Sequence, residues 1–194
     1  MQQGLIHPFE NMSQQRFRLS FRVFLGITVV MLIILSLLGV PLQQCRTVSG
    51  GKCDIVSFEL ARTPAYSGAI VDAWRQHEVL QYAKWNTWLD YLFMVGYSNS
   101  VALGLLWLLQ FPFPPRWKNR IRLLAWAQWL VLTADALENA ALLRILYSTA
   151  ISPWPQAAFV CALIKFGLLG AGVVCLAIGF WYRKRTTAEA GAFK

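Results

Sequence analysis

The sequence has few charged side chains for its length. Asp, Glu, Lys and Arg make up only 14% of its 194 residues, whereas they make up about a quarter of an ordinary soluble domain. Four cysteines are too few for a disulfide-rich scaffold, and a sequence that is 57% apolar is not intrinsically disordered. No internal repeat is visible, which disfavours a transporter built from inverted repeats. The composition therefore disfavours a soluble single-core protein.

Catalytic and cofactor motifs are also lacking. The sequence contains no Walker A motif, no G-x-G-x-x-G, no H-E-x-x-H and no C-x-x-C, so it has no signature of nucleotide binding, zinc hydrolysis or thiol redox chemistry. Its two histidines, His7 and His77, are not paired at helical spacing, which excludes ligation of a haem by two histidines. We expect no catalytic residue, no metal and no cofactor.

The basic residues are not spread over one surface. A net charge of +9 would suggest nucleic acid binding if it lay on one soluble face. Instead, most of the basic residues form three clusters, each beside a long apolar run. These clusters are Arg16, Arg18 and Arg22; Arg116, Lys118, Arg120 and Arg122; and Arg183, Lys184 and Arg185. We therefore expect a membrane as the partner, and no nucleic acid.

Four apolar stretches approach the roughly 20 residues that cross the hydrocarbon core of a bilayer. They predict spans at residues 23–43, 88–110, 123–147 and 157–182. The fold class expected from these spans is an all-α membrane protein, a bundle of four transmembrane helices.

Basic residues near the ends of the spans predict their orientation, because cytoplasmic loops carry the excess of Lys and Arg. The basic segments 1–22, 111–122 and 183–194 are all placed in the cytoplasm if both ends of the chain lie there. Residues 44–87 and 148–156 then form the outer loops.

The long outer loop contains one clear helix signal. Thr63 is a good N-cap, Pro64 suits the first helical position, and apolar residues then recur at three and four residues. This pattern predicts an extracytoplasmic amphipathic helix over residues 64–80. Cys45 and Cys53 flank a short loop on the same side, where an oxidising compartment would permit a disulfide. We expect that disulfide, with two free thiols as the alternative.

Ionisable residues within a span are costly and are often functional. Spacing at 3.6 residues per turn places most of the polar residues of spans two and three on single stripes. We expect Lys165 to pair with Glu138 or Asp135, and Asp90 to pair with Arg144. The predicted polar cluster, in the outer half of the bundle, comprises Asp90, Tyr97, Gln128, Asp135, Glu138, Asn139, Arg144 and Lys165.

Span four also carries small residues at every fourth position. They are Gly167, Ala171, Cys175 and Gly179. Such a ridge lets a neighbouring helix approach closely. The neighbour is either another span of this chain or a partner subunit, and the spacing does not decide between them.

Four short strings stand out beside these features. They are Phe58-Glu59-Leu60-Ala61, Leu89-Asp90-Tyr91-Leu92-Phe93, Asp135-Ala136-Leu137-Glu138-Asn139 and Lys165-Phe166. Together they resemble a group of small bacterial four-span membrane proteins of uncharacterised function. The resemblance implies a protein of the bacterial inner membrane and implies no activity.

Several functions remain open. The buried charges can be purely structural, fixing which helix faces which. We favour a non-enzymatic accessory subunit of a membrane complex, with a membrane protein as partner, or a small protein that binds a lipid or a polar or cationic ligand. The alternative is a small transporter or a protein that conducts protons or ions through the cluster. The third is a lipid-modifying enzyme with Asp135 or Glu138 as general base.

Overall fold

A computed structural model describes residues 6–148 and 152–192 of the chain, with side chains up to residue 184. This part of the chain is almost entirely helical. It contains no β-strand, only one isolated bridge between Arg46 and Lys52. The predicted all-α class is therefore confirmed.

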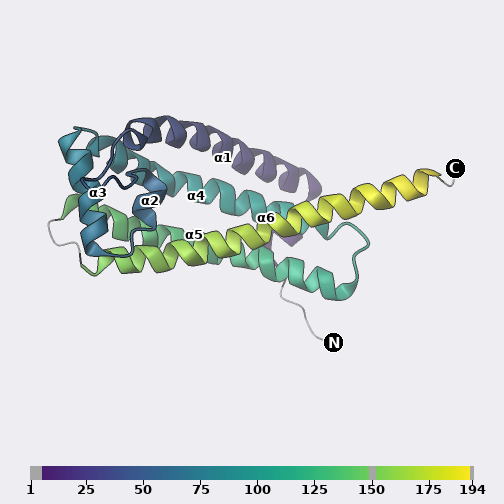
Figure 1. Ribbon diagram of the computed structural model, residues 1–194. Coiled ribbons are helices and arrows are strands. Elements are labelled where there is room, and N and C mark those ends of the chain that lie inside the picture. The colour runs from purple at the N-terminus through teal and green to yellow at the C-terminus, as the bar shows by residue number, and fades with distance from the viewer. Residues whose placement is uncertain (1–5, 149–151, 193–194) are drawn as a thin grey trace.

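Four long helices lie side by side (Figure 1): α1 (Gln14–Gln43), α4 (Leu80–Leu108), α5 (Pro115–Tyr147) and α6 (Trp154–Ala192). Helix α5 packs between α4 and α6, and α1 packs along α4. Three of them, namely α1, α4 and residues Trp154–Lys184 of α6, are long and apolar enough to cross a membrane. Each predicted span overlaps one long helix. The helices are longer than the spans because apolar composition marks the hydrocarbon-soluble part of a helix and not its ends.

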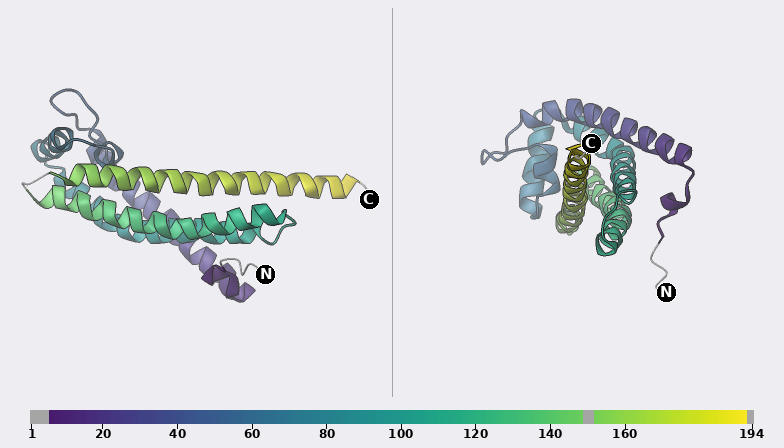
Figure 2. Two further views of the ribbon diagram at one scale, coloured as in Figure 1. Left: turned by 90° about the horizontal axis from the view of Figure 1, so that it is seen from below. Right: turned by 90° about the vertical axis from the view of Figure 1, so that its right-hand side faces the viewer.

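A small cap covers one end of the bundle (Figure 2). It consists of α2 (Ile55–Glu59), α3 (Pro64–Gln76) and the segments that join them to α1 and α4. Asp54 caps α2 by accepting a hydrogen bond from Ser57 N at 2.8 Å. The predicted helix over residues 64–80 is present as α3, but it ends at Gln76. Glu78 has a positive φ of 57°, which breaks the helix before α4 begins.

The cap has its own apolar core. Trp74 is fully buried, meets Phe58 edge to face with the ring centroids 5.0 Å apart, and donates a hydrogen bond from Nε1 to the carbonyl oxygen of Cys53 at 2.7 Å. The predicted Cys45–Cys53 disulfide is wrong, because both residues are free thiols. Each thiol donates to a backbone carbonyl: Cys45 Sγ to Pro41 O at 3.6 Å, and Cys53 Sγ to Gly51 O at 3.7 Å. Burial raises the pKa of both thiols, which keeps them protonated.

The other end of the bundle holds a short 3-10 helix, η1 (Pro8–Asn11). His7, which precedes it, is buried with its ring centroid 4.8 Å from the rings of both Trp126 and Trp129. Burial lowers the pKa of His7, so the imidazole packs as a neutral ring. An ion pair of 3.0 Å between Glu10 and Arg122 also ties η1 to α5.

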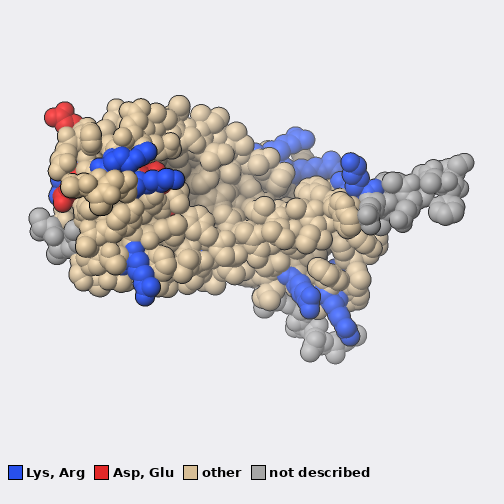
Figure 3. Space-filling view, viewed as in Figure 1, with Lys and Arg blue, Asp and Glu red and all other residues tan. Residues whose placement is uncertain are grey.

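Charged side chains on the face seen in Figure 3 lie towards the two ends of the bundle, with uncharged surface between them. The basic clusters at the start of α1, at the start of α5 and near the end of α6 belong to the end away from the cap. A bundle that spans a membrane has this distribution, because the middle of such a bundle faces hydrocarbon.

The small-residue ridge of α6 is not one contact surface. A Cβ atom on Gly179 would lie 2.5 Å from Leu108 Cδ1, so this position does pack closely, but a Cβ on Gly167 would meet open space. Ala171 is exposed and Cys175 is partly buried. The closely packed positions are instead Gly172, against Gln128, and Gly179. Gly172 and Gly179 are two helical turns apart and so lie on nearly the same face of α6. Residues spaced by four do not stay on one face, because a helix has 3.6 residues per turn.

Candidate functional site

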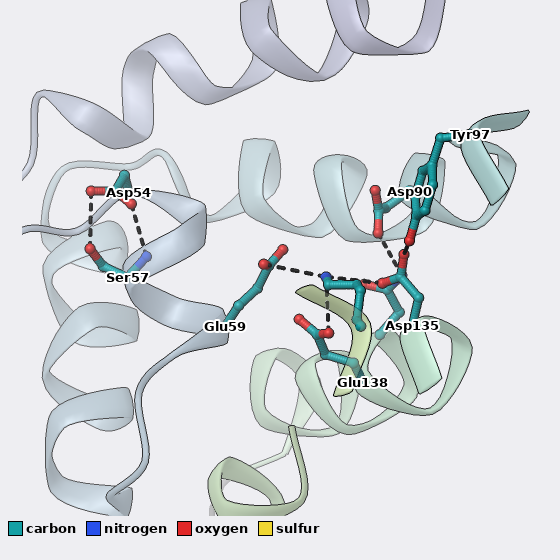
Figure 4. Close-up of polar contacts among 9 residues, drawn as sticks. Asp54, Ser57, Glu59, Asp90, Tyr97, Asp135 and Glu138 are labelled. Carbon is teal, nitrogen blue, oxygen red and sulfur yellow. Dashed lines mark hydrogen bonds and ion pairs between the residues drawn. The ribbon is translucent and has the colours of Figure 1, made fainter. Parts of the chain in front are cut away.

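Lys165 lies in the first third of α6 with its side chain buried beneath the cap. Its ammonium nitrogen is 2.9 Å from Glu138 Oε2, 3.1 Å from Asp135 Oδ1 and 3.4 Å from Glu59 Oε2. Figure 4 shows the three carboxylates converging from α2 and α5. The predicted pairing of Lys165 with Glu138 or Asp135 is confirmed, and both pairs form at once.

Glu59 is the cluster residue that the sequence did not predict. It is the last residue of α2, and its side chain is only 12% exposed. It lies outside every apolar span, so nothing in its local sequence distinguishes it from a surface glutamate. The only sequence feature that singles out Glu59 is its place in Phe58-Glu59-Leu60-Ala61, one of the four strings on which the resemblance rests. Burial raises the pKa of the Glu59 carboxyl, while the Lys165 ammonium acts in the opposite direction.

Two further contacts extend the cluster towards α4. The phenol of Tyr97 donates a hydrogen bond to Asp135 Oδ2. Asn139 Nδ2 donates to Asp90 Oδ2 at 2.7 Å. We call the full set the Lys165 cluster, and it comprises Glu59, Asp90, Tyr97, Asp135, Glu138, Asn139 and Lys165.

The predicted Asp90–Arg144 pair is wrong. Arg144 is exposed, and its guanidinium lies 6.0 Å from the ring centroid of Trp154. Asn139 takes the position opposite Asp90 instead. Five residues of helix separate Asn139 from Arg144, so the two side chains point in directions about 140° apart.

Gln128 is buried as predicted but does not belong to the Lys165 cluster. It lies two turns from Asp135 along α5, about 10 Å away. Its Nε2 atom donates to Leu124 O at 3.3 Å within α5 and to Leu168 O of α6 at 3.4 Å. Gln128 therefore joins two helices and does not contribute to the buried charge.

Carboxylates outnumber cations in the Lys165 cluster. With every group ionised, Glu59, Asp90, Asp135 and Glu138 would carry four negative charges against the single positive charge of Lys165. Such an excess is very costly away from water. Glu138 Oε1 is buried and accepts no hydrogen bond from any residue that the structure describes. The arrangement can thus store protons. Among the described residues, no group of His, Cys, Asp and Glu side chains has the geometry of a metal site.

Tyr97 connects the Lys165 cluster to a groove on the other side of α4. This groove has a volume of about 790 Å³ and lies between α1, α4, the C-terminal half of α6 and η1. We call it the α1–α4 groove. Thr28 and Ser100 lie beside Tyr97 in its lining, and their hydroxyl oxygens are 3.4 Å apart. Tyr97 therefore contacts Asp135 of the Lys165 cluster and also lines the α1–α4 groove.

No protein-family model, curated protein or solved structure matches this chain. The four strings that carry the resemblance, although far apart in the sequence, nevertheless meet in space. They supply Glu59, Asp90, Asp135, Glu138, Asn139 and Lys165 of the Lys165 cluster.

Proposed function

We propose that this protein crosses the bacterial inner membrane four times, with both ends in the cytoplasm, and that α5 is the fourth span. Two of the three charges in residues 123–147, Asp135 and Glu138, are buried against other helices, and the third, Arg144, lies in the last turn of α5. The outward positions Leu123, Leu130 and Leu137 are exposed and apolar. A helix of this kind can lie in a bilayer because its carboxyl groups do not meet lipid and an arginine in its last turn can reach the interface.

Amine labelling tests this orientation. In intact spheroplasts, a reagent that cannot cross membranes should modify Lys52, which is exposed in the cap, and should leave Lys118 unmodified. In inverted vesicles the reagent should modify Lys118 and Lys184 and should leave Lys52 unmodified. If Lys52 and Lys118 are labelled from the same side, the proposed threading is wrong.

For the function, we infer a non-enzymatic binding or accessory protein of the membrane, in which the Lys165 cluster joins the cap to the bundle and binds protons. The observation that carries this proposal is the contact of one buried lysine with three carboxylates, one of them supplied by the cap. Lys165 itself occupies the position that a cationic ligand would take. A proton is the ligand that needs no such space, since it binds directly to a carboxylate oxygen.

Docking of the cap should therefore depend on pH through Glu59. Lys165, Asp135 and Glu138 face Glu59 from α6 and α5, and Asp90 from α4 lies near it. Burial raises the pKa of the docked Glu59 carboxyl above its ordinary value. At a pH between the ordinary pKa of Glu59 and its raised pKa in the docked cap, the docked carboxyl is protonated and the undocked carboxyl is ionised. Docking of the cap therefore takes up a proton, and the free energy of docking becomes more favourable as the pH falls.

Hydrogen exchange of the α2 and α3 amides between about pH 5 and about pH 8 measures this effect. After correction for the intrinsic exchange rate, protection should decrease as the pH rises. Glu59→Gln should flatten the profile, whereas Glu78→Gln, at an exposed position next to the cap, should keep it. Protection that increases with pH, or a Glu59→Gln profile equal to the wild type, would contradict the proposal.

Proton conduction is the second candidate, and the position of Tyr97 favours it. Its phenol contacts Asp135, while its side chain also lines the α1–α4 groove. Glu59, at the other end of the cluster, belongs to the cap and therefore to the outer loop. A chain of exchangeable protons therefore runs from the cap to the groove.

Liposome flux distinguishes conduction from simple binding. If the protein conducts, a pH-sensitive dye in liposomes should report proton entry that Tyr97→Phe and Glu138→Gln each reduce at least tenfold. Tyr91→Phe is the matched control, because the Tyr91 hydroxyl donates to the backbone carbonyl of Ala136 and not to a carboxylate of the Lys165 cluster. Equal rates in all four proteins and in empty liposomes would remove this candidate.

A further inference from the structure

The α1–α4 groove is a second feature of the molecule, separate from the charge of the Lys165 cluster. We propose that it binds one phospholipid with an anionic headgroup, in the leaflet at the basic end of the bundle. The acyl chains lie along the apolar wall of the groove, and the headgroup phosphate lies between Arg18 and Arg22. The inference does not depend on the proposed function of the Lys165 cluster.

The groove arises from the way in which α1 crosses α4. A Cβ atom on Gly96 of α4 would lie 2.9 Å from Ile27 Cγ2 and 3.0 Å from the backbone nitrogen of Thr28. The two helices are therefore in close contact at this level. From there α1 runs at an angle to the other long helices, so its first turns stand away from them (Figure 2). The groove opens between these turns and the end of α4.

The dimensions of the groove suit one lipid. Its lining runs along α1 from Gln14 to Thr28, fourteen residues and therefore about 21 Å of helix. This is about half of the roughly 40–45 Å thickness of a bilayer with its headgroup layers, which is the depth of one leaflet with its headgroups. The volume of about 790 Å³ lies in the range of ligand sites, about 300–1,000 Å³.

The lining combines an apolar wall with basic residues, as a phospholipid requires. The wall is mainly apolar and aromatic, with the hydroxyl groups of Thr28, Tyr97 and Ser100 at its deep end. Its main side chains are Phe17, Phe21, Leu25, Trp107, Leu176 and Phe180. The basic residues Arg18 and Arg22 line the shallow end, at the level where α1 leaves its apolar run. Basic pockets between membrane helices at this depth are suited to anionic headgroups.

Arg18 and Arg22 are available for a headgroup. Both are exposed, and neither has an ion pair or hydrogen bond to any residue in the described part of the chain. Glu10 also lines the groove, but it pairs with Arg122 at 3.0 Å and so does not neutralise either of them. Two unpaired guanidinium groups favour a phosphate, which accepts paired hydrogen bonds from arginine. The headgroup of a zwitterionic lipid would bring a further positive charge close to Arg18 and Arg22.

Native mass spectrometry of delipidated protein, titrated with dioleoyl phosphatidylglycerol or dioleoyl phosphatidylcholine, tests the proposal. We expect the wild type to retain one phosphatidylglycerol at least tenfold more tightly than phosphatidylcholine. The double variant Arg18→Gln/Arg22→Gln should lose that preference. Arg116→Gln/Arg120→Gln removes the same charge from exposed positions of α5 and should keep it.

Two further arms separate the groove from general surface charge. Leu25→Trp fills the groove from a side chain that is 42% exposed and keeps both arginines, so it should weaken lipid retention at least fivefold. Inorganic phosphate in large excess should not displace the lipid, because it cannot occupy the apolar wall. The proposal is overturned if both double variants lose binding equally, if Leu25→Trp binds as the wild type does, or if phosphate competes fully.

Discussion

Lys165→Met should lower the free energy of unfolding by about 3–5 kcal/mol, the range found when one partner of a buried ion pair is removed. Methionine keeps most of the volume of the lysine side chain, so the loss comes from charge and not from a cavity. Asp135, Glu138 and Glu59 would remain buried around the position of the lost ammonium group, with no cation between them. Equilibrium unfolding in mixed micelles, monitored by tryptophan fluorescence, measures the change.

Two companion variants make the interpretation of Lys165→Met specific. Lys52→Met changes an exposed lysine of the cap and should stay within about 0.5 kcal/mol of the wild type. Adding Glu138→Gln to Lys165→Met removes one of the stranded carboxylates and should restore part of the lost stability. If the double variant is less stable than Lys165→Met, charge imbalance is not the cause of the loss.

Much of this architecture follows from sequence patterns because the patterns have a direct physical cause. The long apolar runs predict the four long helices, since burial in hydrocarbon or protein requires them. Spacing at 3.6 residues per turn predicts that Asp135, Glu138 and Asn139 share one buried face of α5, and it does so without knowledge of the neighbouring helices. Depth along the helices then predicts that Lys165 meets Asp135 or Glu138.

Features that depend on the relative placement of distant segments do not follow from these patterns. Glu59 reaches Lys165 only because the cap folds back over the bundle. Asp90 contacts Asn139, which lies about 7.5 Å along α5 from Arg144. The rotation of α5 points Arg144 outwards, and an expected depth does not contain that rotation. The α1–α4 groove depends on the crossing angle of α1, which is a property of side-chain packing and not of hydropathy.

The close contact at Gly96 leads to a second large expected effect. Gly96→Leu should destabilise the protein by about 1–3 kcal/mol, the usual cost of adding atoms to a tightly packed site. The nearest obstacle to a Cβ includes the backbone nitrogen of Thr28 at 3.0 Å, which cannot rotate away as the end of a side chain can. Helix α1 must therefore move from α4. Unfolding in mixed micelles measures the loss.

Gly26→Leu is the matched control for Gly96→Leu. Gly26 lies in α1 beside Ile27, one of the residues that Gly96 contacts, yet a Cβ atom on it would meet nothing within 4 Å. Both substitutions replace glycine by leucine within a long apolar helix, so they share any gain in helix propensity and in apolar surface. The difference between them isolates the α1–α4 contact, and equal stabilities would show that α1 does not pack on α4 at Gly96. Because this contact forms where the α1–α4 groove ends, Gly96→Leu should also weaken lipid retention, whereas Gly26→Leu should not.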